Sequence, residues 1–353
     1  MSFFTEAVNS DVVDSFFAAA NTQNGFVSYF DSIFQSAPMI YVIKGGPGTG
    51  KSTLMNKIAS EAVGRGYTVT KYLCSSDPSS LDGVLVKGKF AVIDGTAPHS
   101  SDPRCIGALD KMIDLSPMWD DRILLERKES ICRLSGEIAD RYAHAYRILS
   151  SMGSLEQEYY QTVFEHLNMP KLQRLVARIA KKAANQQTTS EGTRSVITEA
   201  ISTKGYVHLS SVENSVTKAF CMKGRYHEEV WFLKLLKEAL DKAGACYTQS
   251  LSPLTLEPCS IAIGNQRAFV SVDRIDNQSR MYNTSRFLLP TVALQRSRLS
   301  TMSKALKLMS GTATSLLAEA GTLHLELEEI YKSAMNYEKL ERFTKRLMIS
   351  LFC

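Results

Sequence analysis

The sequence lacks the features that mark a membrane or secreted protein. No apolar run approaches the roughly 18 residues that a membrane-spanning helix needs. The N-terminus carries Glu6, Asp11 and Asp14 where an export signal would have basic and then apolar residues. The seven cysteines are odd in number, scattered and without a C-x-x-C pair, which argues against a disulfide framework and a zinc site. These absences predict a cytoplasmic protein that contacts no membrane.

A strong charge of one sign is also missing. The formal net charge is only +5, from 41 basic and 36 acidic residues. No segment interleaves basic and aromatic side chains as a nucleic-acid platform does, and the basic stretch at residues 171–182 is interpreted as a solvated helix face. With 44% hydrophobic and 22% charged residues, a chain of 353 residues is expected to form two soluble globular domains without a nucleic-acid partner.

What the sequence does contain is a glycine-rich segment between two apolar segments. Residues 45–52 read GGPGTGKS and fit G-x-x-x-x-G-K-[ST], after the apolar run at 39–43 and before an amphipathic stretch at 53–58. This context predicts a strand, a tight turn and a helix, whose backbone N–H groups and positive N-terminus suit a phosphate. The residues expected to bind the phosphates of a nucleoside triphosphate are Gly46, Pro47, Gly48, Thr49, Gly50, Lys51, Ser52 and Thr53.

Three residues are expected to act on the triphosphate or its metal ion. Lys51 can neutralise the β- and γ-phosphate oxygens and Ser52 can hold Mg²⁺. Asp94 ends an apolar run 43 residues after Lys51, where such proteins place the carboxylate that holds the magnesium shell. We therefore expect ATP and Mg²⁺ as ligands, with Lys51 and Asp94 as catalytic residues. Because Gly95 follows, the glutamate that often activates water after this aspartate is missing.

Asp77 is a further catalytic candidate. It follows a segment at 67–73 that alternates like a β-strand, and small-molecule kinases often place an acid there to accept the proton of the acceptor hydroxyl. The sequence Asp77-Pro78 equally favours an ordinary Asx-Pro turn. The two interpretations carry equal weight.

The chain also repeats itself, and the second copy has lost the glycine loop. Asp94 lies 50 residues after Lys44, and Asp273 lies 50 residues after Lys223. In place of the loop, residues 224–231 read GRYHEEVW, with no lysine or hydroxyl at the positions of Lys51 and Ser52. Two adjacent carboxylates there would repel phosphate. The second copy is therefore predicted to be a site that binds no nucleotide.

These observations predict an α/β fold with a parallel P-loop NTPase-like sheet, duplicated in tandem, each copy followed by a long helical arm. The first domain is expected at residues 1–185 and the second at 195–353, joined by a polar linker at 183–196. We expect a helix at 5–20, a strand at 25–30 and a helix from about 120 that breaks at Gly153. Apolar spacing over 299–334 favours a long helix packed on the arm of the other copy over an intermolecular coiled coil.

Several segments resemble a family of bacterial tandem P-loop ATP-binding proteins, known mostly as uncharacterised ATPases. The resemblance spans nearly the whole chain and is carried by residues 25–32, 44–52, 74–78, 81–83 and 94–99, which read GFVSYFDS, KGGPGTGKS, CSSDP, LDG and DGTAPH. Membership implies ATP binding by Gly48, Gly50, Lys51 and Ser52, with Asp94 on the metal. In that family the second copy usually keeps a glycine- and lysine-containing loop, and this sequence departs from the pattern at residues 225–231.

The sequence thus predicts an Mg-ATP-binding protein, an ATPase that hydrolyses ATP slowly and couples this to a conformational change. One alternative is a small-molecule or nucleotide kinase that uses Asp77 as its base. Another is a non-enzymatic ATP-dependent switch or scaffold, in which the helical arms bind a protein partner.

Overall fold

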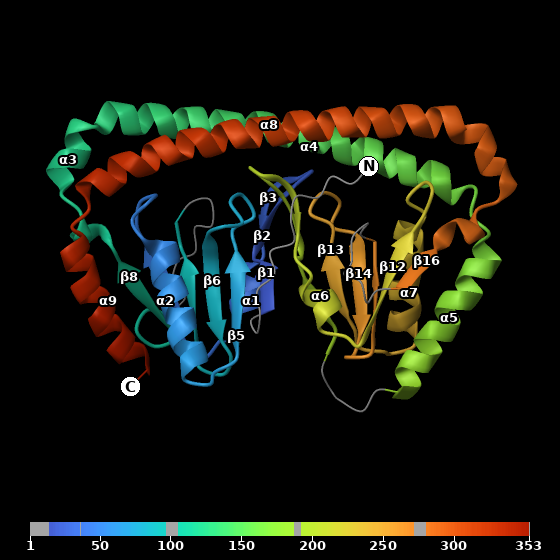
Figure 1. Cartoon of the computed structure of the whole chain (residues 1–353), viewed down its shortest axis with the longest axis horizontal. Helices are drawn as coiled ribbons and strands as arrows, with labels where there is room; N and C mark the ends of the chain where they lie inside the picture. Colours follow the sequence, from blue (N-terminus) through green and yellow to red (C-terminus); the bar gives the residue numbers. More distant parts are fainter. Residues whose placement is uncertain (1–13, 36, 97–104, 187–191, 272–279, 353) are drawn as a thin grey trace.

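A computed structural model describes residues 14–35, 37–96, 105–186, 192–271 and 280–352. It is a mixed α/β structure with two six-stranded sheets (Figure 1). The strands of the first sheet, in spatial order, are β1 (Asp14–Phe17), β5 (Val69–Leu73), β6 (Leu81–Val86), β7 (Phe90–Asp94), β4 (Ile40–Lys44) and β8 (Asp110–Asp114). Those of the second are β9 (Arg194–Val196), β13 (Thr248–Leu251), β14 (Pro258–Ile263), β15 (Arg267–Val270), β12 (Lys218–Lys223) and β16 (Arg280–Asn283).

The two sheets have the same topology, so the predicted duplication of an α/β unit is confirmed. Each copy also has a separate two-stranded hairpin, a short helix and a longer helix beside its sheet. In the first copy these are β2 (Ala19–Thr22), β3 (Gly25–Ser28), α1 (Phe30–Phe34) and α2 (Lys51–Gly64). In the second they are β10 (Glu199–Ser202), β11 (Gly205–His208), α6 (Ser211–Asn214) and α7 (Glu229–Lys242).

The prediction of a parallel sheet was wrong in part, because each sheet is mixed. In the first sheet, β7, β4 and β8 run parallel, as do β1 and β5, but β6 is antiparallel to both of its neighbours. The reason is local: β6 and β7 are joined by a turn of three residues, 87–89, in which Gly88 has a φ of 72°. So short a connection joins only antiparallel strands. The sheet order also places β7, which ends at Asp94, directly beside β4.

Three local expectations were also wrong. The helix expected at 5–20 is instead strand from Asp14, and residues 1–13 lie outside the described part of the chain. The segment from residue 15 to 20 is buried on all sides, so it lacks the polar face of a surface helix. Gly153 does not break its helix. It lies against the β2–β3 hairpin, where a side chain would collide with Gln23. Residues 183–186 and 194–196 of the expected linker are helix and strand.

After each sheet the chain continues in a long helix and a shorter one. The first pair, reached through η1 (Ser116–Met118) and α3 (Asp121–Glu126), is α4 (Lys128–Phe164) and α5 (Met169–Gln186). The second pair, reached through η2 (Thr284–Phe287) and η3 (Pro290–Gln295), is α8 (Arg296–Ala334) and α9 (Tyr337–Phe352).

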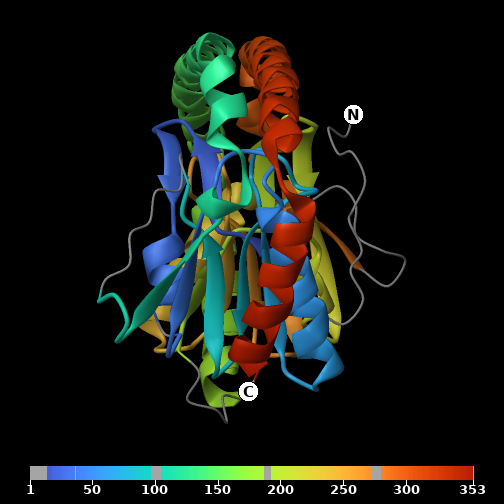
Figure 2. The same ribbon diagram turned by 90° about the vertical axis from the view of Figure 1, so that its left-hand side faces the viewer.

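The helices α4 and α8 lie side by side and antiparallel across one edge of both sheets (Figures 1 and 2). They have 37 and 39 residues, long enough to reach from one sheet to the other. As a result α5 packs on α7 of the second copy, whereas α9 lies beside α2 of the first. Each copy therefore carries the terminal helix of the other. Among the described helices, none is both long and apolar enough to cross a membrane.

A buried cluster ties α4 and α8 to the second hairpin. Leu317 of α8 is fully buried with Ala145 and Leu149 of α4 and Ile201 of β10. We expect Leu317→Ala to lower the free energy of unfolding by about 2–5 kcal/mol, because it leaves a cavity at this junction. The matched control is Leu308→Ala on the same helix, at a side chain that is 73% exposed, which should change it by less than about 0.5 kcal/mol. Urea unfolding followed by circular dichroism measures both, and equal effects would contradict the assignment.

A buried ion cluster in the second hairpin makes stability depend on pH. His208 lies with Nε2 3.0 Å from Glu213 and Nδ1 3.5 Å from Glu199. Burial alone would lower the pKa of His208, but these two carboxylates outweigh it and raise the pKa to about 10.

Because the folded pKa of His208 is raised above the unfolded value of 6.5, its contribution is complete below pH 6.5 and is lost as pH rises toward 10. We expect the free energy of unfolding to fall over this range by on the order of a few kcal/mol. His208→Gln should flatten the profile, whereas His144→Gln, at an exposed position, should not. Denaturation curves at stepped pH measure this, and an unchanged profile in His208→Gln would refute it.

Candidate functional site

The glycine-rich segment forms a tight loop between β4 and α2. β4 ends at Lys44 and α2 begins at Lys51. Gly48 and Gly50 have φ values of 69° and 90°, in the left-handed region that glycine adopts without strain. The loop is closed internally, because the hydroxyl of Thr49 donates to the carbonyl oxygen of Gly46 at 2.8 Å. The two glycines thus produce the turn that the sequence pattern predicts.

The loop presents backbone donors that have no acceptor in the part of the chain that the structure describes. Within the described residues, no hydrogen bond uses the N–H groups of Gly48, Thr49, Gly50 or Lys51. Those at the start of α2 are the unsatisfied donors of a helix N-terminus, where the helix dipole adds positive potential. Successive N–H groups in such a turn form a site that suits an anion.

The side chain of Lys51 folds back over this loop. Its Nζ donates to the carbonyl oxygens of Gly46 at 2.8 Å and Gly45 at 3.1 Å, and lies 3.6 Å from Oδ2 of Asp94. Only 11% of the side chain is exposed. The ammonium group is therefore held at the loop in a poorly solvated position, where its field acts strongly on a bound anion.

Asp94 reaches the loop because β7 pairs with β4. Ile43, two residues before the loop begins, is the register partner of Asp94. One carboxylate oxygen accepts from the N–H and hydroxyl of Thr96, and the other faces Lys51. Burial raises the pKa of Asp94, while Lys51 and Thr96 act in the opposite direction. The structure thus brings together two residues that are far apart in sequence.

Ser52 connects the loop to the neighbouring strand β6. Its hydroxyl oxygen accepts a hydrogen bond from the N–H of Leu81 at 3.0 Å. This contact brings the start of β6 to the first turn of α2.

The structure adds a residue that the sequence reasoning missed, Asp82. It is only 4% exposed. In the antiparallel pairing of β6 with β7, Gly83 lies opposite Ile93, so the preceding residue, Asp82, comes opposite the following one, Asp94. The register between β6 and β5 shifts by one residue at Asp82, which forms a β-bulge. Such bulges often redirect side chains near active sites. Its charge helps to raise the pKa of Asp94. The signal in the sequence was a carboxylate inside the apolar run from 81 to 86.

These oxygens fit a hard divalent cation. Mg²⁺ prefers oxygen ligands and is usually bound by one or two carboxylates together with substrate phosphates and water. Ser52, Asp94 and Asp82 supply a hydroxyl and two carboxylates of that kind. No group of three or more His, Cys, Asp or Glu in the described part of the chain could hold a metal ion alone, so phosphate oxygens would have to complete the set.

The structure places Asp77 in a turn, 43% exposed. Its carboxylate accepts from the N–H and hydroxyl of Ser79 and from the hydroxyl of Ser80, and it pairs at 3.1 Å with Lys204 of the β10–β11 hairpin. Burial alone would raise the pKa of Asp77, but Ser79 and Lys204 outweigh it and hold the pKa below its ordinary value. No hydrogen bond or ion pair among the described residues joins Asp77 to Lys51 or Asp94.

The loop is covered on its outer side by α8, which follows the second sheet. A side chain at Gly46 would collide with the ring of Tyr331, and a Cβ at Gly48 would lie 2.9 Å from the carbonyl oxygen of Glu328. Two of the motif's glycines therefore also allow α8 to approach. The end of a helix from the second copy is in direct contact with the loop of the first.

The corresponding loop of the second copy contains its own anion. It lies between Lys223 and Glu229 and is one residue shorter, and His227, with a φ of 57°, occupies the left-handed position that Gly48 has in the first copy. The carboxylate of Glu228, 1% exposed, accepts from the N–H groups of Arg225 at 3.1 Å and Tyr226 at 2.9 Å. Asp273, the expected counterpart of Asp94, lies outside the described residues.

In chemical terms, the first copy combines N–H donors that have no acceptor in the described part of the chain, a poorly solvated cation and a pair of carboxylates. Together these groups suit a polyphosphate with a bound divalent cation. The second copy combines a similar turn with a built-in carboxylate. Comparison with known proteins adds no relative, since no protein-family model, curated protein or solved structure matches the chain.

The second loop is built around Glu228, and we expect Glu228→Ala to lower the free energy of unfolding by about 1–3 kcal/mol. The substitution removes the acceptor of the Tyr226 N–H and leaves the Arg225 N–H only its hydrogen bond to the hydroxyl of Ser285. Glu228→Gln keeps an acceptor oxygen and should cost less. The control is Glu238→Ala at an exposed position of α7, with an expected change below about 0.5 kcal/mol. Thermal unfolding compares the three variants, and wild-type stability of Glu228→Ala would exclude this role.

Proposed function

We propose that the first copy binds Mg-ATP and hydrolyses it slowly, and that the second copy binds no nucleotide. The observation that carries this proposal is the convergence of Lys51 and Asp94 on a loop whose N–H donors have no acceptor among the residues described. The sequence resemblance to tandem P-loop ATP-binding proteins supports the P-loop NTPase assignment and the choice of ATP. The cysteine pattern favours the cytoplasm as the compartment.

Each residue has a role in this proposal that follows from its position. The N–H groups of residues 48–53 bind phosphate oxygens, and Lys51 neutralises the β- and γ-phosphates. Ser52 and Asp94 hold Mg²⁺, and Asp82 orients its water shell. The bound cation would neutralise the charge that develops on the transferred phosphoryl group.

Slow turnover follows from what stands beside Asp94. The next residue is Gly95, whose carbonyl oxygen accepts from Lys44 Nζ at 2.8 Å, so this position offers no carboxylate to activate water. A kinase reaction through Asp77 would require its carboxylate to leave Ser79 and Lys204. Hydrolysis without a dedicated base is therefore the favoured reaction.

A second candidate is a nucleotide-dependent switch, and the contact between the loop and α8 favours it. Tyr331 and Glu328 touch the loop through Gly46 and Gly48, and α8 extends from there to the second copy. A change in the loop on phosphate binding would shift this helix, and with it the surface that α4 and α8 offer to a protein partner. This switch uses the same nucleotide site, with or without turnover.

Removal of the Lys51 charge tests the proposal. We expect Lys51→Ala to weaken Mg-ATP binding by at least about tenfold, because the β- and γ-phosphates lose their cation. Lys87→Ala removes an exposed lysine from the β6–β7 turn and should bind as the wild type does. Isothermal titration calorimetry with ATP and Mg²⁺ measures both. Full affinity in Lys51→Ala would refute the site, whereas dependence on Glu228 or Glu229 would refute the assignment of roles to the two copies.

A further inference from the structure

The two copies differ in how the exchanged helix packs. In the second copy, α5 buries an apolar face on α7: Leu172, Val176 and Ala180 lie in one cluster with Leu236 and Leu240 of that helix. In the first copy, Thr344 is the one residue of α9 that is buried among those described. Other apolar side chains of α9 are only partly buried against the core of the first copy. The exchanged helix is therefore packed more tightly in the second copy than in the first.

The α9 helix is nevertheless fixed at both ends. Near its start, Leu340 lies where it would be 3.3 Å from a Cβ at Gly50. Near its end, Phe352 stacks on Tyr67 and contacts Phe90, with the Arg65 guanidinium over its ring. Between these anchors α9 packs on the core of the first copy, and a space remains between α9 and α2.

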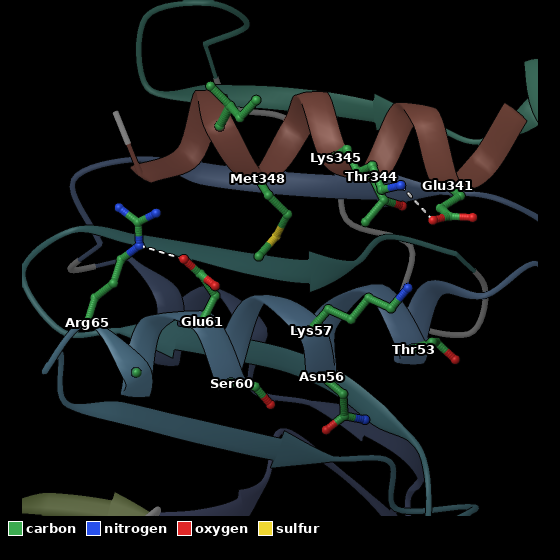
Figure 3. Close-up of a pocket in the computed structure, with 12 residues that line it drawn as sticks. Thr53, Asn56, Lys57, Ser60, Glu61, Arg65, Glu341, Thr344, Lys345 and Met348 are labelled. Atoms are coloured by element: carbon green, nitrogen blue, oxygen red, sulfur yellow. Dashed lines mark hydrogen bonds and ion pairs between the residues drawn. The ribbon is translucent and has the colours of Figure 1, made fainter. Parts of the chain in front are cut away.

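That space is a groove of about 1100 Å³ between α2 and α9 (Figure 3). It is large enough for a nucleoside. Its lining includes Thr53, Lys57 and Ser60 of α2, and Lys345, Met348 and Ile349 of α9.

The groove begins at the phosphate end of the loop. Thr53 is the residue directly after Ser52, so it belongs both to the first turn of α2 and to the groove. Lys51 and Asp94 mark the γ-phosphate end of a bound triphosphate, and the α-phosphate then lies toward Ser52 and Thr53. The atoms beyond the α-phosphate leave the loop at the mouth of the groove.

The side chains of the groove suit such a ligand. Lys345 is paired with Glu341 at 2.8 Å, whereas no ion pair of Lys57 is found among the described residues, and its side chain extends into the groove (Figure 3). Met348 points between the helices and offers an apolar, polarisable surface to a base. The hydroxyls of Thr53 and Ser60 can bond to a ribose.

We propose that the groove between α2 and α9 holds the ribose and base of the nucleoside triphosphate. The second copy contributes α9 to this site, so nucleotide binding in the first copy depends on the exchange of terminal helices. This inference rests on the proposed function. It adds the place of the nucleoside, which the loop alone does not determine.

Comparison of ATP with inorganic tripolyphosphate tests it, because tripolyphosphate uses the loop but not the groove. In calorimetry with Mg²⁺, the wild type should bind ATP at least about tenfold more tightly than tripolyphosphate. Ser60→Trp and Ile349→Trp fill the groove from its two sides at exposed positions, and each should reduce this preference at least about fivefold with tripolyphosphate affinity unchanged. Val63→Trp, exposed on α2 outside the groove, is the matched control and should keep the preference.

The outcomes separate the two proposals. An unchanged preference in both groove variants, or equal affinity of the wild type for the two ligands, would overturn the groove assignment and leave the loop intact. Failure of the wild type to bind either ligand, or tripolyphosphate binding that Lys51→Ala does not weaken, would overturn the proposed function itself.

Discussion

The antiparallel packing of α4 along α8 is the constraint on which the rest of the structure depends. Because α4 and α8 span both sheets, the helix that follows each of them packs on the other copy. α5, after α4, packs on the second copy, and α9, after α8, packs on the first. The same crossing brings Tyr331 and Glu328 against the glycine-rich loop. The surroundings of the first loop are thus built by chain segments that follow the second sheet. Neither copy has its complete set of helices without the other.

The two loops show how one topology supports opposite electrostatics. In the first, the N–H groups have no acceptor among the described residues and Lys51 supplies a positive charge, an arrangement that suits an anion. In the second, Glu228 supplies the anion from within and binds two N–H groups. The exchanged helices also differ between the two copies. α5 fills the space beside α7, whereas α9 leaves a groove beside α2.

The sequence predicted the parts of the site that depend on local pattern. The glycine loop, the helix that follows it and the strand ending at Asp94 all appear as expected, because each is set by residues adjacent in the chain. Asp82 was missed because its position opposite Asp94 depends on strand pairing and on a bulge. Gly153 was interpreted as a helix break because its contact with Gln23, 130 residues earlier, has no local signature.

By itself, then, the sequence determined the duplicated α/β class and the chemistry available at the loop, since glycine positions, charges and apolar periodicity act over short distances. The tertiary structure alone decided the direction of β6, the exchange of α5 and α9, and the groove beside α2. These features arise from contacts between residues that are far apart in the chain, and such contacts form only when both copies pack against the same pair of long helices.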